Sequence, residues 1–117
     1  MLFLCYPKCS TCKKAEVWLN GQGISAMVRD ITTENPTAAE LSQWQAQSGL
    51  PLKRFFNTSG LLYRSLELKD KLPHMSEEAQ LALLATDGML VKRPLLIGKD
   101  FVLVGFQENR WQEALCP

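Results

Sequence analysis

The chain has 117 residues, four cysteines and a formal net charge of +1 at pH 7. This length suits one domain with one core, and a content of 46% hydrophobic and 21% charged residues is typical of a folded globular protein. The small net charge gives no electrostatic basis for direct nucleic-acid binding, and no apolar run is long enough to span a bilayer. The N-terminus shows no signal-peptide pattern, so we expect a cytoplasmic protein.

The first part of the chain predicts a strand, a helix and a second strand with short connections. The apolar residues 1–5 predict a buried strand, and residues 12–20 predict a helix. Gly21-Gln22-Gly23 ends this helix, because glycine adopts the left-handed cap conformation at low cost. Residues 24–31 alternate well enough to predict a second strand, parallel to the first. Together these elements predict a right-handed βαβ unit.

The middle of the chain predicts a helical insert over about residues 36–88. Its helices are recognised by apolar spacing and by polar start signals, and they are expected at residues 35–47, 51–56, 63–72 and 76–85. Residues 57–60 predict a turn between the second and third of them, and Asp87-Gly88 ends the insert.

The last part of the chain predicts two antiparallel strands and a helix. Arg93-Pro94 leads into the first strand, and the three elements are expected at residues 95–97, 101–104 and 107–115. The full order is βαβ, helical insert, ββα. We therefore predict an α/β protein with a four-stranded mixed sheet, formed as a single domain over residues 1–117.

The turn between the first strand and the first helix carries Cys9 and Cys12, with two residues between them. We expect Ser10 or Thr11 to cap the helix by accepting backbone N–H groups. The positive end of the helix dipole then favours the Cys9 thiolate, which is the reactive form of cysteine. Three neighbouring cations add to this effect: Lys8, Lys13 and Lys14. We predict Cys9 as a nucleophile and Cys12 as the thiol that resolves its mixed disulfide.

Two other interpretations of the cysteine pair stay open. A zinc site needs two more ligands, yet Cys5 is expected inside a strand, Cys116 lies at the tail and His74 is the only histidine. We therefore expect no metal and no tightly bound cofactor. A pair without any redox role is the second interpretation.

Four short motifs occur along the chain: Tyr6-Pro-Lys-Cys9-Ser-Thr-Cys12-Lys-Lys-Ala15, Phe56-Asn-Thr-Ser-Gly60, Lys92-Arg-Pro94 and Val104-Gly-Phe106. In their order and spacing they resemble the ArsC/Spx family, which includes glutaredoxin-dependent arsenate reductases and Spx-type regulators. The resemblance covers essentially the whole chain and is closest to Spx/MgsR-like members. It implies a thioredoxin-like fold, a cis peptide bond before Pro94, and Arg93 beside Cys9, where a guanidinium stabilises a thiolate or holds an oxyanion.

The chain also departs from the arsenate reductases that it resembles. Those enzymes carry an arginine where this chain has Asn57, another where it has Gly105-Phe106, and usually no cysteine at the position of Cys12. The resemblance therefore favours thiol–disulfide exchange, with reduced glutathione, glutaredoxin or thioredoxin restoring the dithiol. We expect a monomer whose substrate-binding residues are Lys8, Ser10, Thr11, Asn57 and Pro94. Arsenate reduction is one alternative, and an oxidation switch that binds the α subunit of RNA polymerase is another.

Overall fold

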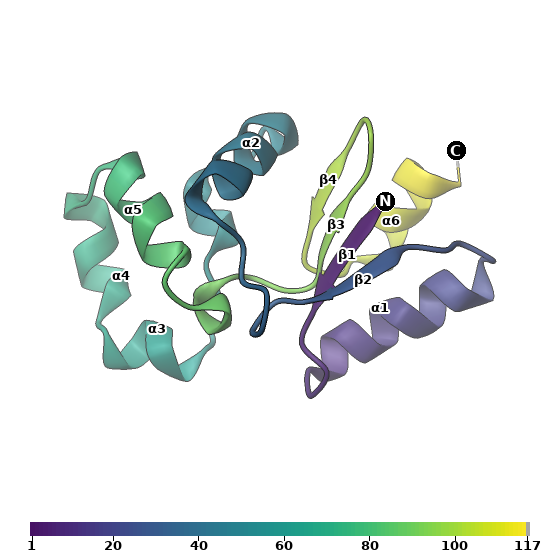
Figure 1. Ribbon diagram of the computed structural model, residues 1–117, viewed down its shortest axis with the longest axis horizontal. Helices are drawn as coiled ribbons and strands as arrows, with labels where there is room; N and C mark the ends of the chain where they lie inside the picture. Colours follow the sequence, from purple (N-terminus) through teal and green to yellow (C-terminus); the bar gives the residue numbers. More distant parts are fainter. Residues whose placement is uncertain (117) are drawn as a thin grey trace.

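A four-stranded mixed sheet runs through the centre of the computed structural model, which describes residues 1–116 (Figure 1). The strands are β1 Leu2–Cys5, β2 Met27–Asp30, β3 Leu95–Ile97 and β4 Val102–Val104. Their order is β2-β1-β3-β4, with β1 parallel to β2 and antiparallel to β3, and with β3 antiparallel to β4. The predicted mixed sheet is thereby confirmed, while Pro117, which the predicted domain includes, lies outside the described residues.

Helices cover both faces of this sheet. In Figure 1, α1 and α6 lie on one side, and the insert helices α2 to α5 gather on the other. The helices are α1 Ser10–Gly21, α2 Ala38–Ser48, α3 Leu61–Ser65, α4 Leu68–Lys71, α5 Glu77–Leu84 and α6 Glu108–Leu115. Short 3-10 turns are η1 Leu52–Phe55, η2 Leu72–His74 and η3 Gly88–Leu90. Among the described residues, no helix is both long and apolar enough to cross a membrane.

The alternation of side chains along β1 divides the core into two clusters. Phe3 and Cys5 point toward α1 and α6, whereas Leu4 between them points toward the insert. Trp111 of α6 is 1% exposed, stacks edge-on against Phe3, and donates its indole N–H to the Gly105 carbonyl at 3.0 Å. Both faces of β1 are therefore buried, which explains why this strand is a continuous apolar run.

Several predicted elements differ in the structure. Strand β2 spans Met27–Asp30, so residues 24–26 and residue 31 of the predicted strand lie outside it. Helix α2 begins at Ala38 instead of residue 35, and the helix expected at residues 51–56 is the 3-10 turn η1.

The single helix expected at residues 63–72 is broken into α3 and α4 by Glu67, whose φ of 56° is left-handed. Tyr63 and Leu68 are both buried, yet an unbroken helix would set positions five apart at about 140° to each other. The break brings both side chains into one core.

One ion pair joins the sheet to the insert. The Arg29 guanidinium donates to both carboxylate oxygens of Glu40 in α2, at 2.7 and 2.9 Å, and also to the Glu34 carbonyl at 2.8 Å. Glu40 in turn accepts from the backbone N–H of Thr37, whose hydroxyl accepts from the backbone N–H of Glu40, in a capping box. The Arg29 guanidinium is the main reason that the pKa of Glu40 falls from 4.5 to about 2.

Replacing Glu40 by Gln tests this junction. We expect the free energy of unfolding at neutral pH to fall by about 1 kcal/mol, since a third of the Glu40 side chain is exposed and solvent screens the pair. The folded-state pKa of Glu40 lies below its ordinary value, so its contribution is present above pH 4.5 and disappears as the pH falls toward 2. Urea denaturation at several pH values measures this, with Glu113→Gln as the control. Equal stability of wild type and Glu40→Gln at neutral pH would contradict the prediction.

Candidate active site

The turn that enters α1 places a cysteine at the N-cap of the helix. Cys9 has extended backbone angles (φ −89°, ψ 119°), and its carbonyl accepts from the N–H of Lys13 at 3.1 Å. The preceding turn is closed by the N–H of Cys9, which donates to the Tyr6 carbonyl at 2.9 Å. The expectation that Ser10 or Thr11 caps this helix is therefore wrong. Both are helical residues, and the N-cap residue is Cys9.

Hydrogen bonds and a nearby charge stabilise the thiolate of Cys9. Partial burial is the largest single influence and by itself raises the pKa. Opposing it are the backbone N–H and the thiol of Cys12, the positive charge of Arg93 and the backbone N–H of Thr11, which together hold the pKa of Cys9 below its ordinary value of 9.0. A lowered pKa is a property of reactive cysteines, while the role of Cys9 as a nucleophile stays a prediction.

Cys12 has the opposite character. It is 2% exposed, and this burial is the main reason that its pKa rises to about 12. The backbone N–H of Tyr6 donates to its sulfur at 3.4 Å, which offsets only part of the increase. The neighbouring Cys9 raises the pKa further, because a second negative charge beside it is unfavourable. Both cysteines are free thiols in this structure.

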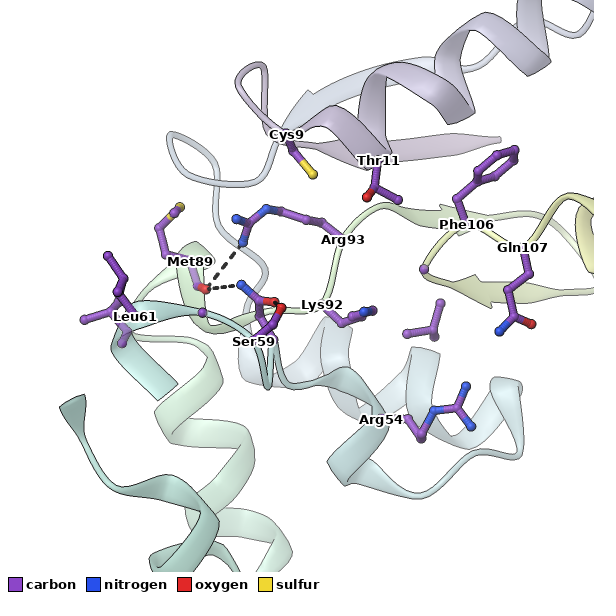
Figure 2. Close-up of a pocket in the computed structure, with 15 residues that line it drawn as sticks. Cys9, Thr11, Arg54, Ser59, Leu61, Met89, Lys92, Arg93, Phe106 and Gln107 are labelled. Atoms are coloured by element: carbon purple, nitrogen blue, oxygen red, sulfur yellow. Dashed lines mark hydrogen bonds between the residues drawn. The ribbon is translucent and has the colours of Figure 1, made fainter. Parts of the chain in front are cut away.

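The loop before β3 supplies the arginine that faces the cysteine pair. The Arg93–Pro94 peptide bond is cis, as the resemblance implies. The Arg93 guanidinium lies over the ring of Tyr6, 5.2 Å from the centroid, and donates from Nη1 to the Met89 carbonyl at 3.5 Å. Its Nε is buried without a hydrogen-bond acceptor among the described residues. Figure 2 shows this guanidinium on the same side of the cavity as the sulfur of Cys9.

A cavity of about 810 Å³ opens beside Cys9, between the sheet and the insert. The cavity is lined by four of the eight residues predicted for the site: Cys9, Thr11, Asn57 and Arg93. The other four do not line it: Lys8 and Ser10 are exposed, and Cys12 and Pro94 are buried behind the wall. Asn57 holds the wall in place through its backbone N–H, which donates to the Leu90 carbonyl at 2.8 Å.

Sequence reasoning missed two cations in this cavity, Arg54 and Lys92. Lys92 had a signal, since it belongs to the Lys92-Arg-Pro94 motif. Arg54 carries no local signal, because it belongs to η1, near the start of the insert and far from Lys92 in sequence. It is brought close when Phe56 pairs with Val91 and when the N–H of Lys92 donates to the Phe55 carbonyl at 2.8 Å.

A β2-β1-β3-β4 sheet with two cysteines at the first strand-to-helix turn, facing a cis-proline loop, defines a thioredoxin-like protein. Comparison with known families makes this more specific. The profile of the ArsC family matches residues 4–114, so the chain belongs to the ArsC family.

Individual relatives agree with this assignment. The chain is 50% identical to YusI of Bacillus subtilis over 113 residues, covering 97% of this chain and 96% of YusI. It is 26% identical to the regulatory protein MgsR of the same organism over 106 residues, covering 91% of this chain and 82% of MgsR.

Solved structures confirm the fold. An ArsC family related protein from Bacteroides fragilis superposes with a TM-score of 0.93 at 55% identity, covering 96% of this chain and 94% of that one. A protein from Streptococcus mutans, described as a possible arsenate reductase, superposes with a TM-score of 0.84 at 45% identity, covering 91% and 90%.

The pH dependence of cysteine alkylation tests the environment of Cys9. In a Cys116→Ser background, we expect iodoacetamide to modify Cys9 first, with a midpoint below pH 9.0, and Cys12 to react only at much higher pH. Arg93→Gln should raise the midpoint for Cys9, because it removes the positive charge that lowers the pKa. Peptide mapping by mass spectrometry gives the rate at each cysteine.

Lys8→Gln is the matched control, since it removes an exposed cation beside Cys9 in sequence. We expect a smaller shift than with Arg93→Gln. A midpoint for Cys9 at or above 9.0, or one that does not respond to Arg93→Gln, would contradict this account.

Proposed function

We propose that the protein carries out thiol–disulfide exchange, with Cys9 as the nucleophile and Cys12 as the resolving thiol. The observation that supports this most directly is the division of roles between the two sulfurs. Cys9 lines the cavity and has a lowered pKa, whereas Cys12 is buried and stays protonated because its pKa is raised to about 12. A nucleophile needs the first property, and a resolving thiol must stay unreactive until the mixed disulfide exists.

The reaction proceeds in two displacements. The Cys9 thiolate attacks one sulfur of a disulfide, forms a mixed disulfide and releases the other half as a thiolate. This step removes the negative charge at Cys9 that helps to raise the pKa of Cys12. Cys12 then loses its proton to the departing thiolate and attacks the Cys9 sulfur, which breaks the bond between Cys9 and the substrate sulfur and releases the second half of the substrate as a thiolate. The substrate gains two electrons, and the protein is left with a Cys9–Cys12 disulfide.

A second thiol must return the protein to its reduced form. Two equivalents of reduced glutathione, or one dithiol of a glutaredoxin or thioredoxin, would reduce the Cys9–Cys12 disulfide by the same exchange chemistry. Neither a metal ion nor a tightly bound cofactor enters these steps. Arg93 acts on the first step, where its charge stabilises the Cys9 thiolate.

Trapping the mixed disulfide tests the proposal. We expect Cys12→Ser to stop after the first displacement and to accumulate a Cys9 adduct with hydroxyethyl disulfide, because no second sulfur can displace it. Cys9→Ser should react slower by about a hundredfold or more, since a hydroxyl is not ionised at neutral pH. Intact-mass spectrometry measures both outcomes.

Cys116→Ser serves as the control for the exposed thiol at the C-terminus. It should form the Cys9–Cys12 disulfide at the wild-type rate. An adduct that forms equally well in Cys9→Ser would show that Cys9 is not the nucleophile.

Arsenate reduction is a second candidate, favoured by the guanidinium beside Cys9 and by the 45% identity to the Streptococcus mutans protein. It needs an oxyanion site, and this chain has Asn57 and Gly105-Phe106 where the reductases that it resembles have arginines. We expect calorimetric titration with arsenate to show binding weaker than millimolar. Tight binding that Arg93→Gln abolishes would favour arsenate chemistry over disulfide exchange.

The relationship to MgsR suggests a regulatory role as the remaining candidate. In this case the Cys9–Cys12 disulfide would form under oxidation and change an interaction with the α subunit of RNA polymerase. Capture of the protein by the purified C-terminal domain of that subunit, dependent on oxidant and lost in Cys12→Ser, would favour this role.

A further inference from the structure

We propose that Arg54 and Lys92, together with Arg93, make the cavity beside Cys9 selective for disulfides that carry carboxylate groups. This inference rests on the proposed exchange reaction and specifies its substrate class: small organic or peptide thiols of negative charge, bound as disulfides. Neither the relatives nor the sequence motifs assign a role to Arg54 or Lys92.

The charge of the cavity is of one sign. The chain as a whole is nearly balanced, with 13 basic and 12 acidic residues. The residues that line this cavity nevertheless include Arg54, Lys92 and Arg93 and no carboxylate. Among the described residues, the only side-chain ion pair joins Arg29 to Glu40. None of the three cavity cations therefore forms an ion pair with a carboxylate of the described residues. A cavity with this lining attracts anions.

The three cations are held together by the backbone. The bridge between Phe56 and Val91, and the hydrogen bond from Lys92 to the Phe55 carbonyl, fasten η1 to the segment that precedes Arg93. Arg54, in η1, therefore lies on the wall opposite the cysteine turn, as Figure 2 shows. The spread of the cations follows from the fold, and it suits a ligand that presents more than one negative group.

The volume of the cavity and its apolar lining residues indicate that the ligand is an organic anion. A volume of about 810 Å³ is in the range that holds ligands the size of drugs, and it is far larger than one tetrahedral oxyanion needs. Apolar side chains form part of the lining: Leu61, Leu62, Met89 and Phe106. An anion with a carbon skeleton can contact these side chains and the cations at once.

The three cations divide their roles. The largest effect of a charge on the pKa of Cys9 comes from Arg93, so Arg93 acts on the reacting sulfur. Arg54 and Lys92 lie further along the cavity, where they can contact the half of the substrate that becomes attached to Cys9. They are therefore specificity-determining residues, and their removal should change the preference among disulfides.

A series of disulfides that differ in charge tests this role. Reduced protein is mixed with dithiodipropionate (anionic), hydroxyethyl disulfide (neutral) or cystamine (cationic), and each rate constant is divided by that of dithiothreitol with the same disulfide. We expect the normalised rate to fall in this order, by about tenfold between the anionic and neutral compounds at low salt, and the difference to shrink as salt increases. Arg54→Gln and Lys92→Gln should each reduce the anionic preference about threefold to fivefold.

Lys99→Gln is the matched control, since it removes an exposed cation in the β3–β4 turn, outside the cavity. It should keep the wild-type preference. Equal normalised rates for the three disulfides, or an anionic preference that survives in the Arg54→Gln/Lys92→Gln double variant, would overturn the inference while leaving thiol–disulfide exchange intact.

A binding measurement separates the two proposals. Thiodipropionate, a thioether that cannot be reduced, should shift the amide resonances of Gly60 and Gly105 in the cavity wall, and neutral thiodiethanol should not. If wild type reduces none of the disulfides but these shifts occur, the exchange function fails and the anion-selective cavity stands. Absence of the shifts, or equal shifts with both thioethers, counts against the cavity.

Discussion

The proposed chemistry depends on a sulfur atom at the N-cap of a helix, that of Cys9. The first backbone N–H groups of any helix lack partners within the helix. At α1 the N-cap residue is Cys9, and the backbone N–H groups of Cys12 and Thr11 lower the pKa of its thiol. Their need for an acceptor is met best when the sulfur is ionised, because a thiolate accepts hydrogen bonds more strongly than a thiol. A requirement of helix formation thus becomes a cause of reactivity.

The same few atoms shift the pKa values of the two cysteines in opposite directions. Both are partly withdrawn from water, which by itself raises the pKa of each. For Cys9, helix N–H groups and the charge of Arg93 lower the pKa. For Cys12, one turn inside α1, the pKa is lowered only by the N–H of Tyr6. Cys9 therefore loses its proton at a lower pH than Cys12 does. The difference in pKa follows from where each sulfur sits relative to the first turn of one helix, and it needs no other acid or base.

Periodic patterns and local signals made most of the fold predictable. The patterns at residues 1–5, 24–31, 95–97 and 101–104 predicted the four-stranded mixed sheet. The strand before Cys9 and the helix that contains Cys12 predicted that this pair lies at a strand-to-helix turn. The break at Glu67 was not predictable, because it satisfies the burial of side chains in a core that the local pattern does not contain. The cap at Cys9 was missed because serine and threonine are the usual caps, and both lay within reach in sequence.

The cavity can be positively charged even where the chain lacks the arginines of a family motif. Asn57 and Gly105 stand where resembling reductases have arginines, and on sequence alone the site loses two of its three positive charges. The fold brings Arg54 and Lys92 to the same cavity through the pairing of residues 55–57 with residues 90–92. With Arg93, the cavity is thus lined by three cations. A changed arrangement around an unchanged nucleophile alters which anions fit more than whether anions are attracted, so substrate choice can differ while the chemistry at sulfur stays the same.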